Sequence, residues 1–190
     1  MLISGRFTRE SCYTIHKDFF LFPFSHNHNQ EDMPMENKTM IQTVKGSIFD
    51  TGRAEGVAVF IPEGLVGIRW EAESFVRAFG VTDLRPEGMV VRSLPEPVRG
   101  IARHLVFFDN LEKKIQTVED MRRQVNNTLD AFAKLGAKTV AMNGIRSRTL
   151  PDKTTRQEAW QRRFVEEYIG KHPGMFETVW LVDKRGGFDK

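Results

Sequence analysis

Apolar positions from residue 40 onward fall into short runs that alternate with longer amphipathic stretches. Continuous apolar runs bounded by glycine, proline or charged residues are typical of strands buried on both faces of a sheet. Two further strand candidates are less apolar and are joined by the proline-containing stretch 94–97. The five predicted strands are 57–61, 88–92, 104–108, 138–142 and 178–182.

In the stretches between these runs, apolar residues recur with the period of an α-helix. The clearest is 118–135, in which apolar residues recur at steps of four, four, three and three and form one stripe. Thr117 precedes this stretch and Asp120 follows three residues later, which is the pattern of an N-terminal helix cap. A glycine follows each stripe and is a stop signal. The three predicted helices are 70–79, 118–135 and 154–169.

Alternating strands and helices predict an α/β fold with a mostly parallel sheet. With 190 residues, the chain fits one domain with an additional segment. Residues 40–190 carry all of the predicted elements, and we expect them to form that domain. Residues 1–39 are largely polar apart from the apolar cluster 19–24, and we expect a poorly ordered N-terminal tail there.

The composition narrows the class of protein. Hydrophobic residues make up 40% and charged residues 28% of the chain, which is the balance of a soluble globular protein. No apolar run approaches the roughly 18 residues that span a bilayer, and the cluster 19–24 is too short for a signal peptide. We therefore expect a cytoplasmic protein without a membrane partner. The net charge of +3 does not by itself indicate a nucleic-acid partner.

The N-terminal tail contains the residues that could bind a metal. Cys12 is the single cysteine, which excludes an internal disulfide and a cysteine-rich zinc site. Cys12, His16, His26 and His28 could supply a thiolate and imidazoles, but their spacing matches no zinc module. We therefore expect a solvated tail, no metal and no cofactor.

A second interpretation of the tail is that it is not translated. Residues 30–32 (Gln-Glu-Asp) can be encoded as CAG-GAG-GAC, which contains a bacterial ribosome-binding sequence upstream of Met35. Translation in a bacterial host would then start at Met33, Met35 or Met40. The intact mass of protein from its native host distinguishes the two interpretations, because a mass that includes Cys12 excludes the later start.

Two strand-to-helix loops are candidate ligand sites, because ligands of open α/β sheets bind beyond the carboxyl ends of the strands. The first loop, 62–68, contains Gly64 and Gly67, and the second loop, 143–149, contains Gly144. Glycines at such turns allow backbone N–H groups to point into the crevice, and the positive end of the following helix favours a phosphate. The alternative interpretation is ordinary turn chemistry.

The second loop is basic. Arg146 and Arg148 offer planar sets of donors that suit phosphate oxygens, and we expect them to contact a phosphate. The following helix is also basic, but Arg162 stands four residues before Glu166 and the next pair repeats this spacing. That spacing predicts a solvated helix face of ion pairs.

Several segments resemble the macro domain, an ADP-ribose-binding α/β/α module. Residues 44–50 (Val-Lys-Gly-Ser-Ile-Phe-Asp) resemble the opening Gly-Asp-Ile segment of that family. Residues 88–91 and 99–107 resemble its central pair of strands, and 129–142 is similar to the helix and strand that lead into its phosphate loop. The resemblance covers residues 40–189 and implies a three-layer α/β/α sandwich with a mixed, mostly parallel central sheet.

The chain also departs from the family pattern. Ser47 takes the place of the aspartate that binds the adenine amino group, and Asp50 is its candidate substitute. Residues 60–63 (Phe-Ile-Pro-Glu) correspond to the family's Asn-Ala-Ala-Asn motif, whose distal asparagine serves the terminal ribose in hydrolytic members. Because neither asparagine is present, the resemblance favours binding over hydrolysis. Glu63 would repel a phosphate unless an arginine paired with it.

Three functions remain open. The first is a module that binds ADP-ribose or a related nucleotide-phosphate in the crevice between 62–68 and 143–149. The second is an ADP-ribosyl or phosphoester hydrolase in the same crevice, with Asp50, Glu63 or His104 as the base. The third is a non-catalytic protein or RNA interaction module with a degenerate pocket, in which the basic helix and an exposed Trp160 would contact RNA. The expected ligand-binding residues are Ser47, Ile48, Gly64, Gly67, Asn143, Gly144, Ile145, Arg146, Ser147 and Arg148.

Overall fold

The computed structural model describes residues 38–50, 54–61, 70–84, 86–109, 114–150, 154–183 and 188. Residues 1–37 of the N-terminal tail, with Cys12 and its histidines, lie outside these ranges, and so does the first loop, 62–68. The domain boundary at residue 40, the translation start and the nature of the tail therefore stay predictions.

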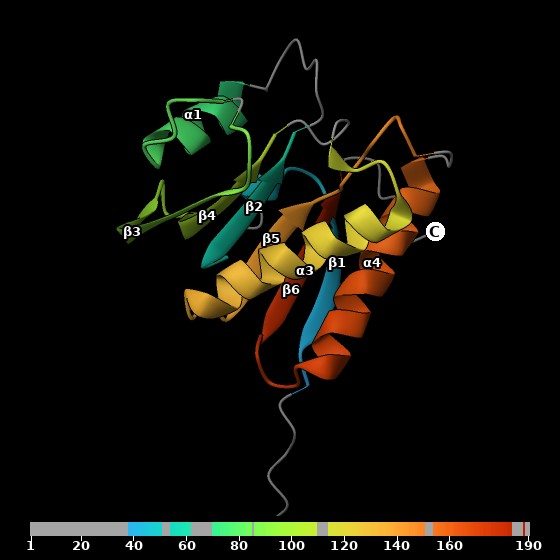
Figure 1. The fold of residues 1–190 in the computed structure, drawn as a ribbon. Helices are drawn as coiled ribbons and strands as arrows, with labels where there is room; N and C mark the ends of the chain where they lie inside the picture. The colour runs from blue at the N-terminus through green and yellow to red at the C-terminus, as the bar shows by residue number, and fades with distance from the viewer. Residues whose placement is uncertain are drawn as a thin grey trace, which may run out of the picture. The chain divides into compact units, whose positions relative to one another are not determined.

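The described residues form a six-stranded mixed sheet (Figure 1). Strands β1, β6, β5, β2 and β4 are parallel neighbours in that order, and β3 pairs antiparallel with β4 at one edge. The mostly parallel α/β sheet expected from the sequence is thus confirmed. The strands are β1 (Met40–Lys45), β2 (Gly56–Phe60), β3 (Val90–Val98), β4 (Ala102–Phe108), β5 (Thr139–Asn143) and β6 (Thr178–Asp183).

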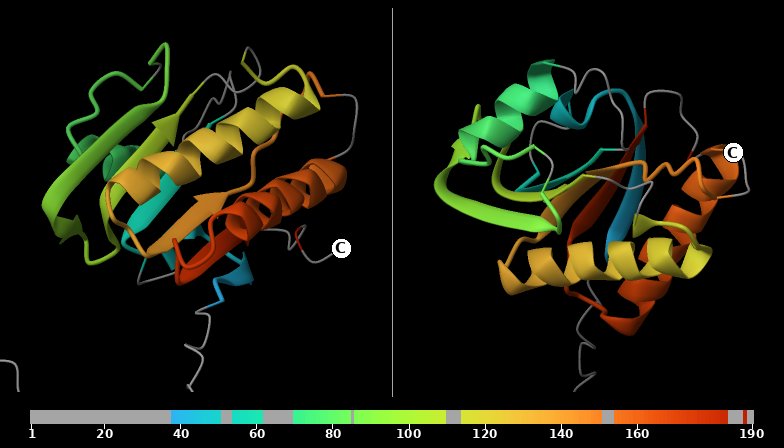
Figure 2. Two further views of the ribbon diagram at one scale, coloured as in Figure 1. Left: turned by 60° about the horizontal axis from the view of Figure 1, so that its bottom comes forward. Right: turned by 45° about the horizontal axis from the view of Figure 1, so that its top comes forward.

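Helices lie on both faces of this sheet (Figure 2). α3 and α4 lie side by side on one face, and α1 covers the other face together with the short 3-10 helix η1. None of the helices in the described ranges is long and apolar enough to cross a membrane. The helices are η1 (Ile48–Asp50), α1 (Trp70–Ala78), α3 (Val118–Lys134) and α4 (Thr154–Lys171).

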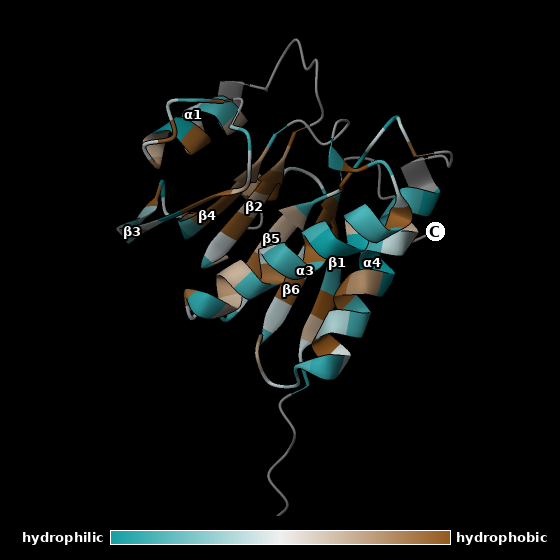
Figure 3. Cartoon of the chain, viewed as in Figure 1, coloured by the Kyte–Doolittle hydropathy of each residue, from teal (hydrophilic) through white to brown (hydrophobic). Residues whose placement is uncertain are grey.

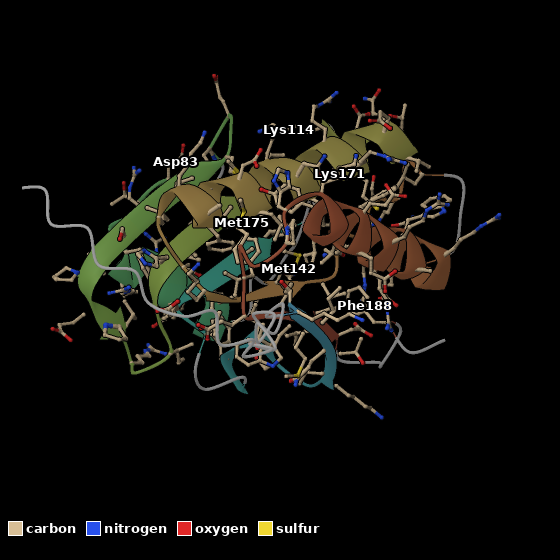
Figure 4. All side chains as sticks on the ribbon, turned by 90° about the horizontal axis from the view of Figure 1, so that it is seen from below. Asp83, Lys114, Met142, Lys171, Met175 and Phe188 are labelled. Carbon is tan, nitrogen blue, oxygen red and sulfur yellow. The ribbon has the colours of Figure 1, made fainter. Side chains whose placement is uncertain are left out.

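Successive residues of the central strands face two separate cores. Val57 and Val59 pack with Phe75 of α1, whereas Ala58 packs with Leu129 of α3 on the opposite face. Since side chains alternate along a strand, a strand between two helical layers must be apolar on both faces. All five residues of β2 are buried, and the brown strands between the partly teal helices of Figure 3 show the same layering. Figure 4 shows α3 and α4 above the sheet, with Met142 of β5 in the core beneath them.

The β3 strand is longer than the sequence predicted. β3 starts at Val90, within the strand candidate 88–92, and continues through the proline-containing stretch to Val98. Proline has no N–H to donate, so it is tolerated in a strand at a sheet edge, which is where β3 lies. The pairing with β4 shifts register between Ser93 and Val98, the segment that contains Pro95 and Pro97. The prediction that this stretch is a connection was therefore wrong.

The predicted N-terminal cap of α3 is confirmed. The Asp120 N–H donates to Thr117 Oγ1 at 3.1 Å, and the Thr117 N–H donates to Asp120 Oδ2 at 2.9 Å. These reciprocal bonds satisfy two backbone donors that a helix start leaves without intrahelical partners. The hydrogen bond from the Thr117 hydroxyl to the carboxylate lowers the pKa of Asp120 below its ordinary value.

The close approach of β2 to α3 gives the first testable prediction. A Cβ added at Gly56 would lie 2.5 Å from Cε1 of the buried Phe132 ring. Gly56→Ala should therefore lower the free energy of unfolding by about 1–3 kcal/mol, measured by urea denaturation. Gly170→Ala is the matched control, because its Cβ would meet nothing within 4 Å. It should be neutral or stabilise α4 by about 1 kcal/mol or less. Equal stabilities of the two variants would contradict the packing described here.

Candidate functional site

The second loop starts where the carboxyl ends of three neighbouring strands meet. β5 lies between β2 and β6, so the chain leaves Phe60, Asn143 and Asp183 at the same edge of the sheet. The segment after β1 reaches this edge as well, because the Gly46 N–H donates to the Asp183 carbonyl at 3.1 Å. This edge is the place where a ligand of an open α/β sheet binds. Glu63, Gly64 and Gly67 lie outside the described residues, and so does the side chain of Asp50.

Asn143 holds the ends of β2 and β5 together. Its Oδ1 accepts from the Phe60 N–H at 2.8 Å, and its Nδ2 donates to the Phe60 carbonyl at 3.0 Å. The amide side chain thereby continues the ladder beyond the last backbone pair, Ala58 with Met142. Both ends of the Asn143 side chain are used inside the protein, and they fix the point at which the first loop leaves the sheet.

Two glutamines of α4 hold the backbone of the second loop. Gln161 Oε1 accepts from the Ile145 N–H at 2.7 Å, and its Nε2 donates to the Asn143 carbonyl at 3.1 Å. Gln157 Oε1 accepts from the Ser147 N–H at 2.9 Å, and its Nε2 donates to the Ser147 carbonyl at 2.8 Å. Both glutamines are buried and stand one helical turn apart. They satisfy buried backbone groups that would otherwise lack partners.

Hydroxyl groups tie the same loop to the chain that precedes α3. Ser147 Oγ donates to the Ile115 carbonyl at 2.8 Å, and Thr149 Oγ1 donates to the same carbonyl at 2.7 Å. Ser147 is buried, and its hydroxyl lies 2.6 Å from that of Thr149. The Ser147 hydroxyl is therefore engaged within the protein, and the ligand contact expected of this residue stays a prediction.

Arg146 is bound by two buried carboxylates. Its Nη2 lies 2.7 Å from Glu158 Oε1 of α4 and also contacts Asp183 Oδ1 at the end of β6. The Glu158 and Asp183 side chains are 2% and 4% exposed, whereas that of Arg146 is 34% exposed. We call these three residues the Arg146 cluster. Buried carboxylates need a partner of opposite charge, and Arg146 supplies it.

These contacts concern the loop for which the sequence suggested a phosphate-binding role. The N–H groups of Ile145 and Ser147 donate to glutamine oxygens, and the Arg146 guanidinium binds carboxylates. These N–H groups and the Arg146 guanidinium are thus engaged within the protein, and a phosphate contact at this loop stays a prediction.

The remaining expected residues occupy different environments. Arg148 is exposed and Gly144 is half-buried. Ser47 Oγ accepts from the Phe49 N–H at 3.3 Å, and Ile48 is buried in the core beneath α1. The Phe49 ring extends this core, with its centroid 5.1 Å from that of Phe75. The side chain of Ile48 thus packs in the interior. Gly46, two residues earlier, lies at the carboxyl ends of the strands.

His104 lies near the amino ends of the parallel strands, at the opposite end of the sheet from the second loop. It pairs with Gly56 at the start of β2, whereas the loop follows the carboxyl ends of the strands. Its Nδ1 lies 2.7 Å from Ser93 Oγ, and its buried Nε2 has no hydrogen-bond partner among the described residues. Burial lowers the pKa of His104 below its ordinary value, the Arg103 charge lowers it further, and Glu55 opposes both effects. This position excludes His104 as the base in the expected crevice.

The outer face of α4 consists of ion pairs, as predicted. Arg162 Nε lies 3.0 Å from Glu166 Oε1, and Arg163 Nε lies 2.8 Å from Glu167 Oε1. Trp160 is half-buried against the core, with the Arg156 guanidinium 5.8 Å from its ring centroid. This face therefore presents paired charges and a partly covered aromatic ring, which does not favour an RNA-binding surface.

A groove of about 790 Å³ lies at the far end of α4. It lies between the start of β1 and the last turn of the helix, and its apolar lining includes Ile41, Ile169 and Pro173. Because α4 starts at the carboxyl edge of the sheet, this groove lies near the amino edge and is separate from the second loop.

The chain is similar to known proteins in its fold, that is, in the arrangement of its strands and helices. No protein-family model matches the sequence, and no curated protein matches it. Solved structures do match. A Trypanosoma brucei macrodomain superimposes with a TM-score of 0.58 at 10% identity, over 78% of this chain and 65% of that chain. The chain has the macrodomain fold.

Two further macrodomain structures support the assignment. The macro domain of ganglioside-induced differentiation-associated protein 2 gives a TM-score of 0.57 at 12% identity, over 80% of each chain. A point mutant of the Oceanobacillus iheyensis macrodomain gives 0.56 at 12% identity, over 81% of this chain and 91% of that chain. These values confirm the expected resemblance at the level of the fold.

Sequence reasoning missed the residues that complete the second loop. Gln157, Glu158 and Gln161 lie on the helix for which the sequence predicts a solvated basic face, and Asp183 ends a strand. One signal was present in the sequence. Gln157 and Gln161 stand four residues apart and lead into the stripe of Phe164 and Tyr168, so polar residues occupy the inward-facing side of the first turns of α4.

The glutamine contacts predict a large effect of one substitution. Gln161→Leu removes the acceptor of the Ile145 N–H and the donor to the Asn143 carbonyl in a fully buried position. It should lower the free energy of unfolding by about 1–3 kcal/mol for each polar group left without a partner, measured by urea denaturation. Lys171→Leu on the exposed end of the same helix is the control. A loss no larger than that of the control would contradict the role of Gln161.

The environment of His104 predicts a pH dependence of stability. Because the pKa is lowered in the folded state, the unfolded chain binds the proton more tightly. Stability should therefore be full above the ordinary histidine pKa of about 6.5 and fall as the pH drops below it. Urea denaturation at neutral and mildly acidic pH should show this loss. His104→Asn, which does not titrate, should lose less stability over the same interval. Parallel losses in both proteins would rule out His104 as the cause.

Proposed function

We propose that this chain is a macrodomain-type module that binds ADP-ribose or a related nucleotide-phosphate. The ligand would occupy the crevice between 62–68 and 143–149. The observation that carries the proposal is the meeting of the carboxyl ends of β2, β5 and β6 with the segment that follows β1. In open α/β sheets that edge is the place where ligands bind.

Structures with the same fold support this choice of ligand. The Trypanosoma brucei macrodomain was solved in complex with ADP and in complex with ADP-ribose. Both structures superimpose on this chain, with TM-scores of 0.57 and 0.56 at 10% identity. At this identity the fold is shared, and transfer of the ligand to this chain is our proposal.

Each part of the crevice would contribute differently. The backbone around Ser47 and Ile48 would contact the base, and the N–H groups near Gly64 and Gly67 would contact phosphate. The second loop, held by Gln157 and Gln161, would form a rigid wall. We propose no hydrolysis, because Phe60 and Glu63 stand where hydrolytic macrodomains have asparagines.

A second candidate function is an interaction module without a small ligand. It is favoured by the internal hydrogen bonding of the second loop, in which Asn143, Ile145, Arg146 and Ser147 all have partners within the protein. A loop of this kind does not need a ligand for its stability. The two candidates differ in whether the isolated protein takes up a nucleotide.

Isothermal titration calorimetry with ADP-ribose tests the proposal. We expect saturable binding with one site per chain and a dissociation constant at or below the millimolar range, since affinities in that range give measurable heats. Guanosine diphosphate controls for the base and ribose 5-phosphate for the terminal sugar. A thermal shift with ADP-ribose should accompany binding. Neither heat nor a shift at millimolar ADP-ribose would reject nucleotide binding and favour the second candidate.

A further inference from the structure

We propose that the groove at the far end of α4 binds the anion of a straight-chain carboxylic acid. The groove has a volume of about 790 Å³, within the range of small-molecule pockets, which is about 300–1,000 Å³. All of its lining residues belong to the described ranges. It is separate from the second loop, so the inference does not depend on the proposed nucleotide binding.

The lining of the groove is mostly apolar. Ile41 of β1 and Ile169 of α4 are half-buried against the core, and Pro173 follows the helix. Thr39 adds a hydroxyl to the lining, but that hydroxyl already donates to the Phe176 carbonyl at 2.7 Å. An alkyl chain would therefore cover apolar surface without depriving this hydroxyl of its partner.

Gly170 leaves open space on the helix beside this lining. It lies within α4, and a Cβ added there would meet nothing within 4 Å. Glycine is a poor helix former, and no described atom requires its small size at this position. Bare backbone does allow a ligand to approach closely. We therefore expect the alkyl chain to lie across Gly170.

The charge of the lining favours an anion at the other end of the ligand. Lys38 and Glu166 are the charged residues of the lining. Glu166 Oε1 lies 3.0 Å from Arg162 Nε, whereas no residue in the described part of the chain pairs with Lys38. Lys171 places a further cation in the last turn of α4, where it offsets the partial negative charge of the helix end (Figure 4). The Lys38 ammonium group can therefore pair with a carboxylate.

The size of the groove decides between a small ligand and a second protein. Its eight lining residues are far fewer than the roughly 20–30 residues that each partner contributes to a stable protein interface. An alkyl chain gains binding free energy from the apolar surface that it covers and needs no hydrogen bonds, so it fits both the size and the lining.

Isothermal titration calorimetry with straight-chain carboxylates at neutral pH, where they are ionised, tests the inference in the unaltered protein. Along the series octanoate, decanoate and dodecanoate, each below its micelle concentration, the affinity should rise about two- to fourfold for each added methylene. Decanol has the chain without the charge and should bind more weakly than decanoate. Acetate has the charge without the chain and should not bind. Absence of decanoate binding, or equal affinities along the series, would overturn the inference.

Filling the groove gives a second test. Gly170→Leu places a side chain in the open space, and it should abolish decanoate binding while α4 stays folded, because leucine is the better helix former. Arg163→Leu is the matched control, because it adds a leucine to the exposed outer face of the same helix. Lys38→Gln should lower the affinity for decanoate about two- to fivefold and leave that for decanol unchanged. Decanoate binding that survives Gly170→Leu would overturn the inference.

Thermal melts establish that each variant is folded. If Gly170→Leu does not fold, Lys38→Gln and the chain-length series decide. A dimer in analytical ultracentrifugation that Gly170→Leu dissociates would indicate a second copy in the groove and overturn the inference. Competition between decanoate and ADP-ribose would move the ligand to the carboxyl ends of the strands and overturn it as well. Decanoate binding in a protein that does not respond to ADP-ribose would support this inference and reject only the proposed function.

Discussion

Buried N–H groups at a strand-to-helix turn require acceptors, and much of this structure depends on how the second loop obtains them. Gln157 and Gln161 supply the acceptors from inside α4, at positions one helical turn apart. The loop and the helix are thereby fixed to one another, and the end of β5 is fixed with them through the Asn143 carbonyl. A loop that completes its hydrogen bonds within the protein has a defined shape in the isolated chain.

The Arg146 cluster places three charged groups together at the carboxyl ends of the strands. Arg146 would be a strong anion ligand if it were free, but Glu158 and Asp183 convert it into a structural cation. Removal of either carboxylate would alter the packing around Arg146, because the three groups are in contact. The role of an arginine in such a loop therefore depends on which side chains the following helix directs at it.

The periodicity of the sequence predicts the three helices and most strands, because each buries an apolar stripe or face. It misplaces the end of β3, where an edge position tolerates Pro95. Of the site, the sequence predicts the location of the second loop but not its contacts. The partners of Arg146 are 12 and 37 residues away in the chain, and local sequence patterns do not reveal such distant pairs. The glutamines are detectable only as polar residues on an inward helix face.

The two edges of the sheet differ in their ability to accept another strand. Along β3, Pro95 and Pro97 lack the N–H groups that an added strand would pair with, and the shifted register bends the edge. Along β1, the six residues Met40–Lys45 contain no proline and pair regularly with β6. Among the described residues, the proline-containing edge strand is therefore the less able of the two to pair with an added strand.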